Sequence, residues 1–468
     1  MTGRLPQDRG LDLATLVDQF SAEPRLHPIG LQHYWGGTDA VELLPAVVEH
    51  LANGSPATVL TDATPKRRGV QDLASLLRGQ FATSHVATDW HVLGDSQHPP
   101  VADEATLGWA NDAAHGSRVV VSVGSGTMTD IGKLAAASAG AEHVAVQTAA
   151  SVNGFADDQS VVLRNGVKRT APSRWPTGLV VDAQVLADAP VSMNLAGIGD
   201  LMSMFSAVPD WYIANQLGFD DSWSPTVFAL LCARSADVVQ WPKGVAAGDP
   251  DTLVQLAEML ALSGLTMGAV GNTAPSSGLE HLVSHMIEMA ADARGQAVAL
   301  HGARVGVATL IASSAWEMFT QRVGQGHLNL RVPDADEVRP LIEEAFSSLD
   351  PSGAMAAECW KACSRKLKWF STHEAAVSAV LGQWGEHLRF LDPILRAPAD
   401  LKSAVRDSDF PDRFPSLVPP VGEEEALWAV KNCWLMRDRI TIADLAMLTG
   451  NWKSQDVDSV LTSVMSRQ

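Results

Sequence analysis

Three of the 14 histidines, His281, His285 and His301, lie within 21 residues, and imidazole is a common ligand of divalent metal ions. His281 and His285 are four residues apart, a spacing that places both on one face of a helix. His301 begins another apolar run of helical period. The pair lacks the glutamate of the zincin motif HExxH, and histidines on a helix face are often half-buried structural residues. The spacing leaves both interpretations open, a metal site and ordinary helix packing.

A catalytic metal site also needs a carboxylate, and Asp200 is the candidate. It follows Gly197 and Gly199 and opens an apolar stretch of helical character. Two imidazoles and one carboxylate would leave a position open for water or substrate, as a catalytic ion requires. The alternative is that Asp200 caps the start of a helix, a frequent use of aspartate. Met204, one turn later, is a thioether and a poor zinc ligand.

A glycine-rich segment, VGSGTMTDIGK (123–133), joins a predicted strand to a predicted helix. Gly124 and Gly126 would let backbone N–H groups approach an anion closely, and the helix N-terminus adds a favourable dipole for the pyrophosphate of a dinucleotide. Thr127 adds a hydroxyl, and Asp130 falls in the first turn of the helix. The pattern is neither GxGxxG nor GxxxxGKS, and a junction of this kind also needs glycine for steric reasons. Both interpretations stay open on the pattern alone.

Asp62 lies near the end of the β-rich run PATVLTDA (56–63). A carboxylate at the end of this strand can bind a ribose 2′-hydroxyl and repel a 2′-phosphate, which favours NAD(H) over NADP(H). Aspartate at a strand end is also a common turn residue, so the preference for NAD(H) is a hypothesis.

The first part of the chain has the pattern of an α/β domain. Strand-like and helix-like runs alternate, which predicts a parallel sheet with helical connections. We predict strands at 56–63, 91–95, 117–126, 143–151 and 178–186. We therefore expect an α/β domain over residues 1–188.

The rest of the chain has the pattern of packed helices. Beyond Ala189 apolar residues recur every three or four positions, notably over 251–269 and 303–319. The polar, proline-rich segment 401–422 predicts a surface crossing between helices. We therefore expect a helical domain over residues 189–468.

The composition limits the classes of partner. The formal net charge of −19 argues against a nucleic-acid partner, although a locally basic pocket can still hold a small anion. No apolar run approaches the ~18–20 residues of a membrane span, and the N-terminus lacks the apolar core of a secretory signal. The four cysteines form no CxxC pair, so we expect buried, reduced thiols. The sequence thus predicts a cytoplasmic protein without a membrane span.

Five motifs occur in order along the chain: VGSGTMTDIGK (123–133), TAASVNGF (148–155), AGIGDLMSMFSAVPDW (196–211), SGLEHLVSHMIEM (277–289) and HGARVGVATL (301–310). Together they resemble the sn-glycerol-1-phosphate dehydrogenase family, within the superfamily of glycerol dehydrogenase, iron-containing alcohol dehydrogenase and dehydroquinate synthase. The resemblance covers about residues 30–330 and continues more loosely through RDRITIADLAMLTG (437–450). It implies a dehydroquinate synthase-like fold, with an α/β dinucleotide-binding domain and an all-α metal-binding domain.

The resemblance also implies roles for the candidate residues. Asp200, His281 and His301 would bind the metal, and His285 would line the substrate end of the pocket. Zinc is the first choice for such a ligand set, and Ni²⁺ or Fe²⁺ are alternatives. The residues expected at the cofactor NAD are Gly124, Ser125, Gly126 and Thr127 at the pyrophosphate, Thr148 and Ser151 near the ribose and nicotinamide, Asp62 near the adenosine ribose, and Asp130 in the helix that follows the turn.

Two positions depart from the family pattern. Asn153 stands where these dehydrogenases commonly have an aspartate that contacts substrate hydroxyls, and an amide keeps hydrogen bonding but has no charge. Met204 stands where they often have lysine, so a cation that would suit a phosphorylated substrate is missing. The remaining basic candidates in this part of the sequence are Lys168, Arg169, Arg174 and Arg304.

The implied reaction is the NAD(H)-dependent reduction of a small ketone, with dihydroxyacetone phosphate and sn-glycerol 1-phosphate as the expected pair. His285 is the predicted proton relay, because an unperturbed imidazole has a pKa of about 6.5. The alternatives are a dehydroquinate synthase-like lyase or cyclase without net redox, a dehydrogenase of unphosphorylated alcohols, and a non-catalytic protein that kept the fold. The family implies a homo-oligomer that acts on a small carbonyl or polyol.

Overall fold

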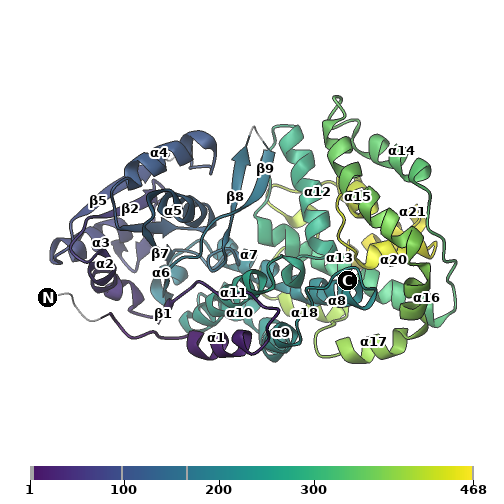
Figure 1. The fold of residues 1–468 in the computed structure, drawn as a ribbon, viewed down its shortest axis with the longest axis horizontal. Helices are drawn as coiled ribbons and strands as arrows, with labels where there is room; N and C mark the ends of the chain where they lie inside the picture. The colour runs from purple at the N-terminus through teal and green to yellow at the C-terminus, as the bar shows by residue number, and fades with distance from the viewer. Residues whose placement is uncertain (1–4, 96–97, 165–166, 466–468) are drawn as a thin grey trace. The chain divides into compact units, whose positions relative to one another are not determined.

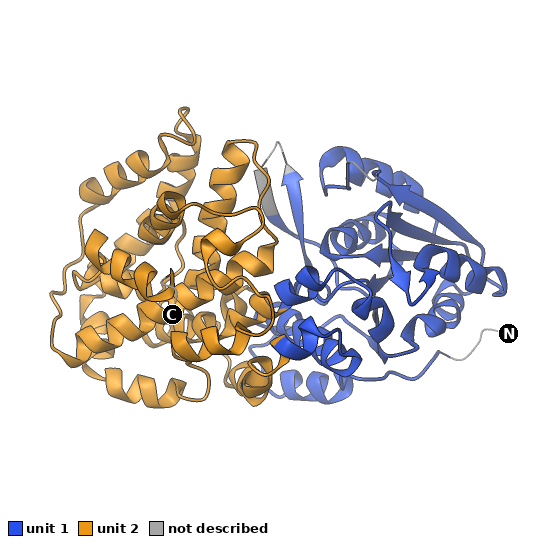
Figure 2. Ribbon diagram, turned by 180° about the vertical axis from the view of Figure 1, so that it is seen from behind, with its two compact units in different colours: residues 1–197, 243–271 blue, residues 198–242, 272–468 orange. Residues whose placement is uncertain are grey.

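The computed structural model describes residues 5–95, 98–164 and 167–465 and divides the chain into two compact units. Unit 1 contains residues 1–197 and 243–271, and unit 2 contains residues 198–242 and 272–468 (Figure 2). These ranges differ from the expected division between residues 188 and 189. Helix α11 (Pro250–Val270) packs on strands β1 (His33–Gly37) and β10 (Gly178–Asp182), so it belongs to unit 1. Helical periodicity predicts the helix but not the surface that its apolar face covers.

Unit 1 is built on a six-stranded, all-parallel sheet in the order β1-β10-β7-β6-β2-β5 (Figure 1). Its four other strands are β2 (Ala57–Asp62), β5 (Thr88–Leu93), β6 (Val119–Gly124) and β7 (Glu142–Gln147). Five of the six strands match the predicted positions, and β1 was not predicted. The predicted ends of β7 and β10 were too long, because β7 stops at Gln147 and helix α6 (Ala183–Ala187) begins directly after β10.

Helices cover both faces of this sheet. These helices are α2 (Leu44–Ala52), α3 (Leu73–Ala82), α4 (Glu104–Ala114) and α5 (Gly126–Ala139), with the short η1 (Ala40–Leu43) before α2, and α1 (Leu13–Ser21) precedes β1 in the chain. Because side chains alternate along a strand, neighbouring residues enter different cores. Val59 and Val121 pack with α2 and α3, whereas Leu60 and Val120 pack with α4 and α5. The continuous apolar strands in the sequence reflect this burial on both faces.

Two small antiparallel pairs accompany the main sheet. They are β3 (Arg67–Arg68) with β4 (Gln71–Asp72), and β8 (Gln159–Arg164) with β9 (Val167–Pro172). Neither hairpin was predicted from the sequence. The side chains of Lys168 and Arg169, two of the basic candidates, lie outside the described residues.

The strand order places a topological switch point between β2 and β6. From β2 the chain first adds β5 on one side and then returns to add β6, β7 and β10 on the other side. At such a point the connections leave in opposite directions, and the carboxyl ends of the two strands border a crevice that commonly binds nucleotides. Asp62 ends β2 and Gly124 ends β6, so both predicted cofactor residues lie at this point.

Within its described residues, unit 2 is built of helices. Those that position the candidate site are α8 (Met204–Gln216), α12 (Leu279–Ala293), α13 (His301–Gly324) and α15 (Ala354–Thr372), with the short η2 (Ala274–Ser276) and η4 (Cys433–Leu435). The others are α9 (Pro225–Val238), α14 (Ala335–Phe346), α16 (Glu374–Gly382), α17 (Trp384–Leu391), α18 (Pro398–Val405), η3 (Phe414–Ser416), α19 (Glu423–Asn432), α20 (Ile442–Leu448) and α21 (Ser454–Met465). Helices α7 (Val191–Met202) and α10 (Trp241–Ala246) continue across the divisions between the units.

The predicted crossing at 401–422 is partly helical. Helix α18 extends to Val405, and an irregular segment with η3 then leads to α19. The four cysteines are free thiols, and Cys359, Cys363 and Cys433 are buried, in agreement with the expectation of reduced residues.

Two helical stretches, Val191–Gln216 and Pro250–Val270, are long and apolar enough to cross a membrane. In each of them 83% of the apolar window is buried inside the structure. This burial is typical of core helices in a globular domain.

Candidate functional site

Asp200, His281 and His301 converge in unit 2. One potential ligand atom from each residue lies within 4.8 Å of the other two, and both imidazole Nε2 atoms face Asp200 Oδ1, at 3.8 Å from His281 and 3.6 Å from His301. Their burial is uneven, since the Asp200 side chain is 2% exposed and that of His301 is 33% exposed. Two imidazoles and a carboxylate that converge on a partly open position are suited to a catalytic divalent ion.

Two glycines allow the helices that carry this cluster to approach closely. A Cβ atom on Gly199 of α7 would lie 2.1 Å from the carbonyl oxygen of Gly302, and one on Gly306 would lie 2.7 Å from Gly199 Cα. Larger residues at these positions would separate α7 from α13 and move Asp200 away from His301. The helix-cap interpretation of Asp200 is wrong, because Asp200 lies near the C-terminal end of α7.

The first turn of α12 is held by two buried carboxylates. Asp210 of α8 accepts hydrogen bonds from Leu279 N at 2.9 Å, Trp316 Nε1 at 3.0 Å and Ile442 N at 2.9 Å. Burial and the nearby charge of Glu280 raise the pKa of Asp210 well above its usual range. The hydrogen bonds from the three N–H donors offset part of the free-energy cost of burying the Asp210 carboxylate, and they fix the start of α12.

Glu280 contacts the metal-ligand candidate directly. Its Oε1 accepts from His281 Nδ1 at 2.9 Å and from Gly278 N at 2.6 Å, and its Oε2 accepts from Ser206 Oγ at 2.6 Å. Although burial acts to raise it, these contacts lower the pKa of Glu280 below its usual value. A proton on His281 Nδ1 leaves the lone pair on Nε2, the atom that faces Asp200. Glu280 therefore selects the tautomer that can bind a metal.

His285 lies one turn along α12 from His281, with 6.0 Å between ring centroids, and equally far from the ring of His301. Its Nδ1 is 3.5 Å from Glu288 Oε2, and the guanidinium of buried Arg304 is 3.5 Å from Glu288 Oε1. Burial lowers the pKa of His285 to about 4; the contact with Glu288 acts to raise it, and the electrostatic influence of Arg437 and His281 lowers it further. The expectation of a pKa near 6.5 was therefore wrong, because the sequence alone did not indicate this environment.

The imidazole of His301 is also kept in its neutral form. Burial, followed by the electrostatic influence of His281 and Arg304, lowers the pKa of His301 well below its usual range. A neutral imidazole is the form that binds a metal ion, so the environment favours coordination over protonation.

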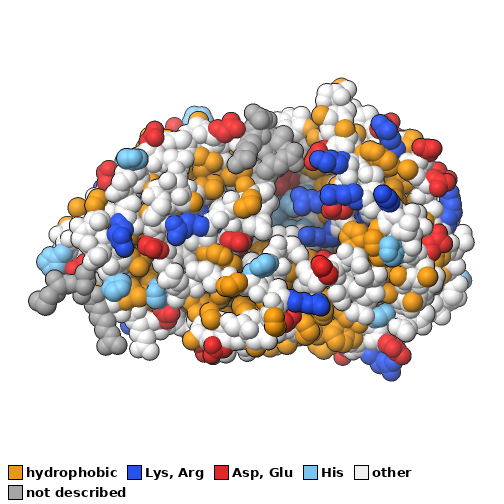
Figure 3. Space-filling model, in the orientation of Figure 1, with side chains coloured by type: hydrophobic (Ala, Val, Ile, Leu, Met, Phe, Trp, Pro, Cys, Tyr) orange, Lys and Arg blue, Asp and Glu red, His pale blue; other side chains and the backbone are white. Residues whose placement is uncertain are grey.

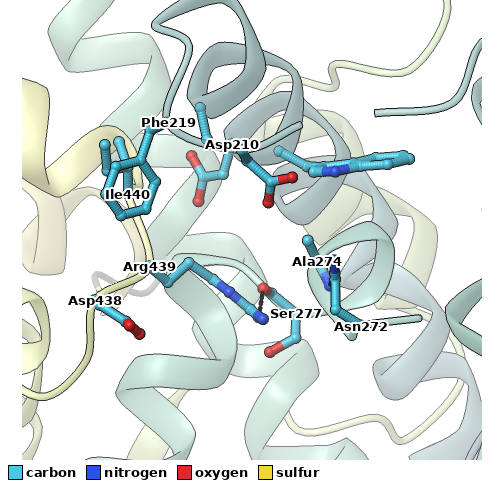
Figure 4. A pocket seen from close by; sticks show the side chains of 11 residues that line it. Asp210, Phe219, Asn272, Ala274, Ser277, Asp438, Arg439 and Ile440 are labelled. Carbon is cyan, nitrogen blue, oxygen red and sulfur yellow. Dashed lines mark hydrogen bonds between the residues drawn. The ribbon is translucent and has the colours of Figure 1, made fainter. Parts of the chain in front are cut away.

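A separate cavity of about 190 Å³ lies in unit 2 beside the start of α12 (Figure 4). Arg439 extends along it and donates to the carbonyl oxygen of Ser277 and, at 2.9 Å, to Thr273 Oγ1. Burial, followed by the like charge of Arg437, lowers the pKa of Arg439 to about 10. Arg439 therefore ties the segment 437–441 to the turn that precedes the metal-ligand helix.

The cofactor candidates lie together in unit 1. Thr148 N donates to the carbonyl oxygen of Gly124 at 3.1 Å, and a Cβ on Gly124 would lie 3.3 Å from Asp62 Oδ2. A Cβ on Gly126 would lie 3.0 Å from Val152, so Val152 and the buried segment 148–151 before it, which includes Ser151, border the turn. Ser125 occupies the N-cap position of α5 without a side-chain capping bond. The Ser125 side chain therefore does not cap the first N–H groups of this helix, at Gly126 and Thr127. A pyrophosphate site requires N–H groups that a side chain does not cap in this way.

Asp62 is paired with a cation that the sequence reasoning did not consider. Lys66 Nζ lies 2.9 Å from Asp62 Oδ2, and Thr64 N donates to Asp62 Oδ1 at 2.8 Å. The carboxylate still borders Gly124, but Lys66 offsets part of its charge. Repulsion of a 2′-phosphate is weaker here than at an unpaired aspartate.

Asp130 is placed differently from the other cofactor candidates. It contacts Ser160 and Val161 of β8 and lies 4.0 Å from Lys133 Nζ. Burial outweighs the attraction of Lys133 and raises the pKa of Asp130 to about 7. These contacts with β8 indicate a structural role.

Asn153 and Gly154 connect the turn region to the rest of unit 1. Asn153 Nδ2 donates to Ser263 Oγ of α11 at 3.2 Å. Buried Lys133 donates to the carbonyl oxygen of Gly154 at 2.7 Å and also pairs with Asp157. Lys133 thus fixes the loop that carries Asn153 to the helix that follows the glycine-rich turn.

Of the basic candidates whose side chains are described, Arg174 and Arg304 have their charges engaged within the protein. Arg174 donates to the carbonyl oxygen of Ala141 in unit 1, and Arg304 is 1% exposed beside Glu288. Sequence reasoning missed Glu280, although it directly precedes His281. The signal that could have found it is the adjacent pair Glu-His at the start of an apolar helix.

Comparisons with known proteins show the family of this chain. A family model described as iron-containing alcohol dehydrogenase matches residues 36–190. A glycerol-1-phosphate dehydrogenase [NAD(P)+] from Halalkalibacterium halodurans is 32% identical over 297 residues, which are 62% of this chain and 73% of the relative. The chain belongs to the glycerol-1-phosphate dehydrogenase family. A relative of the same name from Bacillus licheniformis is 30% identical over 67% of this chain and 78% of its own length.

A solved structure supports the fold assignment. The probable glycerol dehydrogenase from Sinorhizobium meliloti is similar over 92% of this chain and 95% of its own, with a TM-score of 0.54 and 18% identity. The expected fold class, an α/β region and a helical region, is confirmed. The expected family and the class of oxidoreductase are confirmed by the sequence relatives.

Proposed function

We propose that this member of the glycerol-1-phosphate dehydrogenase family reduces dihydroxyacetone phosphate to sn-glycerol 1-phosphate with NADH and a divalent metal ion. The observation that carries the proposal is the convergence of Asp200, His281 and His301, with His285 beside them, in a chain 32% identical to such a dehydrogenase. NADH and a proton are consumed, and the ketone becomes a secondary alcohol. The relatives' names motivate this substrate, and the experiment below tests it.

The donor set fits a divalent metal ion. Asp200 supplies one oxygen, His281 and His301 supply neutral nitrogens, and Glu280 orients one imidazole from behind. We propose zinc, with Ni²⁺ and Fe²⁺ as alternatives, because imidazole and carboxylate suit all three. When bound, such an ion acts as a Lewis acid on the substrate carbonyl.

His285 is the proposed proton relay to the substrate oxygen. With the pKa of His285 lowered to about 4, its imidazole is neutral near pH 7, with a proton on one nitrogen and a lone pair on the other. Glu288 lies beside Nδ1, so the favoured tautomer has its proton on that nitrogen. Transfer through His285 then requires the ring to receive a proton on one nitrogen as it releases one from the other. Buried Arg304 holds Glu288 in place for this function.

Residues 124–127 are the proposed pyrophosphate site, because a helix N-terminus follows a close strand-to-helix turn at the switch point. Thr148 and Ser151 border this turn, and Asp62 is the proposed ribose ligand. We propose a preference for NADH over NADPH that is modest, since Lys66 offsets part of the charge of Asp62. Asn153 is the proposed contact to substrate hydroxyls.

A substrate comparison tests the proposal. The purified protein, supplied with Zn²⁺, is given NADH and either dihydroxyacetone phosphate or unphosphorylated dihydroxyacetone, and the loss of NADH absorbance is followed. We expect NADH oxidation with a higher kcat/KM for the phosphorylated ketone. Oxidation with only the unphosphorylated ketone would contradict the proposed substrate. Binding of NADH without net oxidation of any ketone would favour the lyase or the non-catalytic alternative.

Two further properties stay predictions. We expect a homo-oligomer, which sedimentation of the purified protein measures directly. We also expect a cytoplasmic location, which fractionation of the source cells tests.

A further inference from the structure

The cavity beside the start of α12 is separate from the proposed metal site. Its volume of about 190 Å³ gives room for about six water molecules, and none of the three metal-ligand candidates lines it. Figure 4 shows the guanidinium of Arg439 on one side of the cavity and the carboxylate of Asp210 on the other. Asp220, Asn272 and Arg439 are partly exposed, so a small molecule can enter from solvent.

The guanidinium of Arg439 has only neutral hydrogen-bond acceptors among the described residues. They are the carbonyl oxygen of Ser277 and, at 2.9 Å, Thr273 Oγ1. Removing a charge from water without a direct counter-ion is costly. The lowered pKa of Arg439, about 10, reflects this cost, because burial is its largest cause. An anionic group in the cavity would offset part of the cost.

Asp220 gives the same cavity a negative charge that is also bonded only to neutral groups. Its Oδ1 accepts from Ser222 N at 2.8 Å and from the Ser222 hydroxyl. The two other carboxylates among the described lining residues are engaged, since Asp438 pairs with Arg365 at 2.9 Å and Asp210 accepts from three N–H groups. Asp220 is therefore the carboxylate that can attract a positively charged group.

The rest of the lining provides an amide and apolar surface. Asn272 Oδ1 accepts from Ala274 N at 2.8 Å, which directs the other side of the amide, with its two N–H donors, away from this bond. Trp211, Phe219 and Ile440 supply apolar contacts (Figure 4). The cavity thus combines an arginine and an amide for a carboxylate, a carboxylate for an ammonium group, and apolar contacts for a short side chain.

The outer surface of unit 2 does not select a ligand of one sign. Figure 3 shows both basic and acidic side chains on the visible face of its helices. The formal charge of −19 on the whole chain disfavours a purely anionic ligand, and the guanidinium in the cavity disfavours a purely cationic one. A ligand that carries both charges satisfies Arg439 and Asp220 together.

We propose that this cavity binds a small α-amino acid as its zwitterion, with the carboxylate at Arg439 and the ammonium group at Asp220. A planar guanidinium can donate two parallel hydrogen bonds to a carboxylate. The cavity volume limits the side chain to a small group such as a methyl. The site does not depend on the reaction proposed above. Its occupant would lie against the turn that begins the metal-ligand helix, because Asn272, Ala274 and Ser277 belong to the lining.

The test compares three probes by isothermal titration calorimetry of the purified protein supplied with Zn²⁺. L-Alanine carries both charges, propionate lacks the ammonium group, and ethylamine lacks the carboxylate. Asp220→Asn removes the proposed ammonium partner, and Ala214→Leu fills the cavity from α8. Asp221→Asn is the matched control, because Asp221 is the exposed neighbour that does not line the cavity. Arg439 is kept, since it also fixes the turn before α12.

We expect L-alanine to bind the parent with a Kd below about 1 mM, and propionate and ethylamine to bind at least about 10-fold more weakly. Asp220→Asn should weaken L-alanine binding by about 10- to 100-fold, the range for a lost hydrogen bond between charged groups, without weakening propionate binding. Ala214→Leu should abolish binding of all three probes. Asp221→Asn should bind each probe like the parent.

Three results would overturn the proposal. The first is no binding of L-alanine to the parent with a Kd below about 1 mM. The second is propionate binding as tight as that of L-alanine, which would indicate a site for a plain anion. The third is an unchanged affinity for L-alanine in Asp220→Asn, or an equal loss in Asp221→Asn, which would place L-alanine outside this cavity. Because the titrations contain neither ketone nor NADH, failure of this proposal leaves the proposed reaction unaffected, and the reverse also holds.

Discussion

Replacement of Glu280 by glutamine tests whether this buried carboxylate tunes the proposed metal site. Glutamine has nearly the same shape, and its carbonyl oxygen can still accept from His281 Nδ1 and Gly278 N. Its amide group can donate to Ser206 Oγ if that hydroxyl turns to accept. The substitution therefore removes the negative charge behind His281 while the hydrogen-bonding geometry is kept.

The expected magnitude follows from the role of such partners. Loss of a residue that orients a metal-ligating histidine weakens metal affinity by about 10- to 100-fold, which is about 1.4–2.7 kcal/mol. Because Glu280→Gln keeps the hydrogen bond, we expect about 10-fold, and because Glu280→Ala also leaves buried donors without an acceptor, we expect about 100-fold. Glu317→Gln, on an exposed part of α13, is the matched control and should bind zinc like the parent.

The stability of the metal-free protein tests the charge of Glu280 independently of the metal. Glu280 raises the pKa of buried Asp210, so the two carboxylates disfavour each other in the folded state. Because its contacts nevertheless lower the pKa of Glu280, its charge stabilises the folded state near pH 7, so Glu280→Gln should lower the free energy of unfolding of the metal-free protein and also lower zinc affinity. Zinc affinity is measured by competition with a chromophoric chelator, and stability by denaturant unfolding. Zinc affinity equal to that of the parent, or a free energy of unfolding above that of the parent, would refute the reasoning.

Three further predictions follow from the described contacts. His281→Ala should lose bound zinc and activity together, whereas His285→Ala should retain zinc and lower kcat by about 10²- to 10⁴-fold. Metal analysis and steady-state kinetics check both variants. Full zinc content in His281→Ala would contradict the ligand assignment. Asp62→Ser should weaken NADH binding more than NADPH binding, measured by fluorescence titration, and equal effects on the two cofactors would exclude a contact to the ribose 2′-hydroxyl. Burial raises the pKa of Asp130 from 3.8 to about 7, so the unfolded state loses this proton at a lower pH than the folded state does. The contribution of Asp130 to the free energy of unfolding therefore declines as the pH rises from about 4 to about 7, by at most about 4 kcal/mol. In denaturant titrations, the free energy of unfolding of Asp130→Asn minus that of the parent should therefore be larger at about pH 8 than at about pH 4. A difference independent of pH would show that Asp130 does not titrate in this way.

Much of the fold was predictable because its signals are local. Five of the six strands of the main sheet, and helices α11 and α13, coincide with runs whose period is visible in the sequence. Strand β1 escaped prediction because HYWGG is short and lacks the β-branched run of its neighbours. The β8–β9 hairpin escaped because its residues are polar and mixed.

The candidate site was predictable in its members but not in its environment. Motif order and residue type identified Asp200, His281 and His301, which the structure brings together. The lowered pKa of His285 and the charge that Arg437 directs toward it could not be derived, because they depend on groups about 150 residues apart in the sequence. The role of Glu280 depends likewise on the distant residue Ser206.

The sequence by itself determined which chemical groups this protein has and the order in which they occur. It indicated a dinucleotide turn at 123–133, a metal-binding set and the family to which both belong. The tertiary structure decided which helix covers which surface, where Asp200 lies in its helix, and which carboxylates and cations face each imidazole. The physical reason is distance along the chain. Periodicity and turn signals act over a few residues, whereas burial and charge depend on contacts such as that of Asp210 with Ile442, which are 232 residues apart.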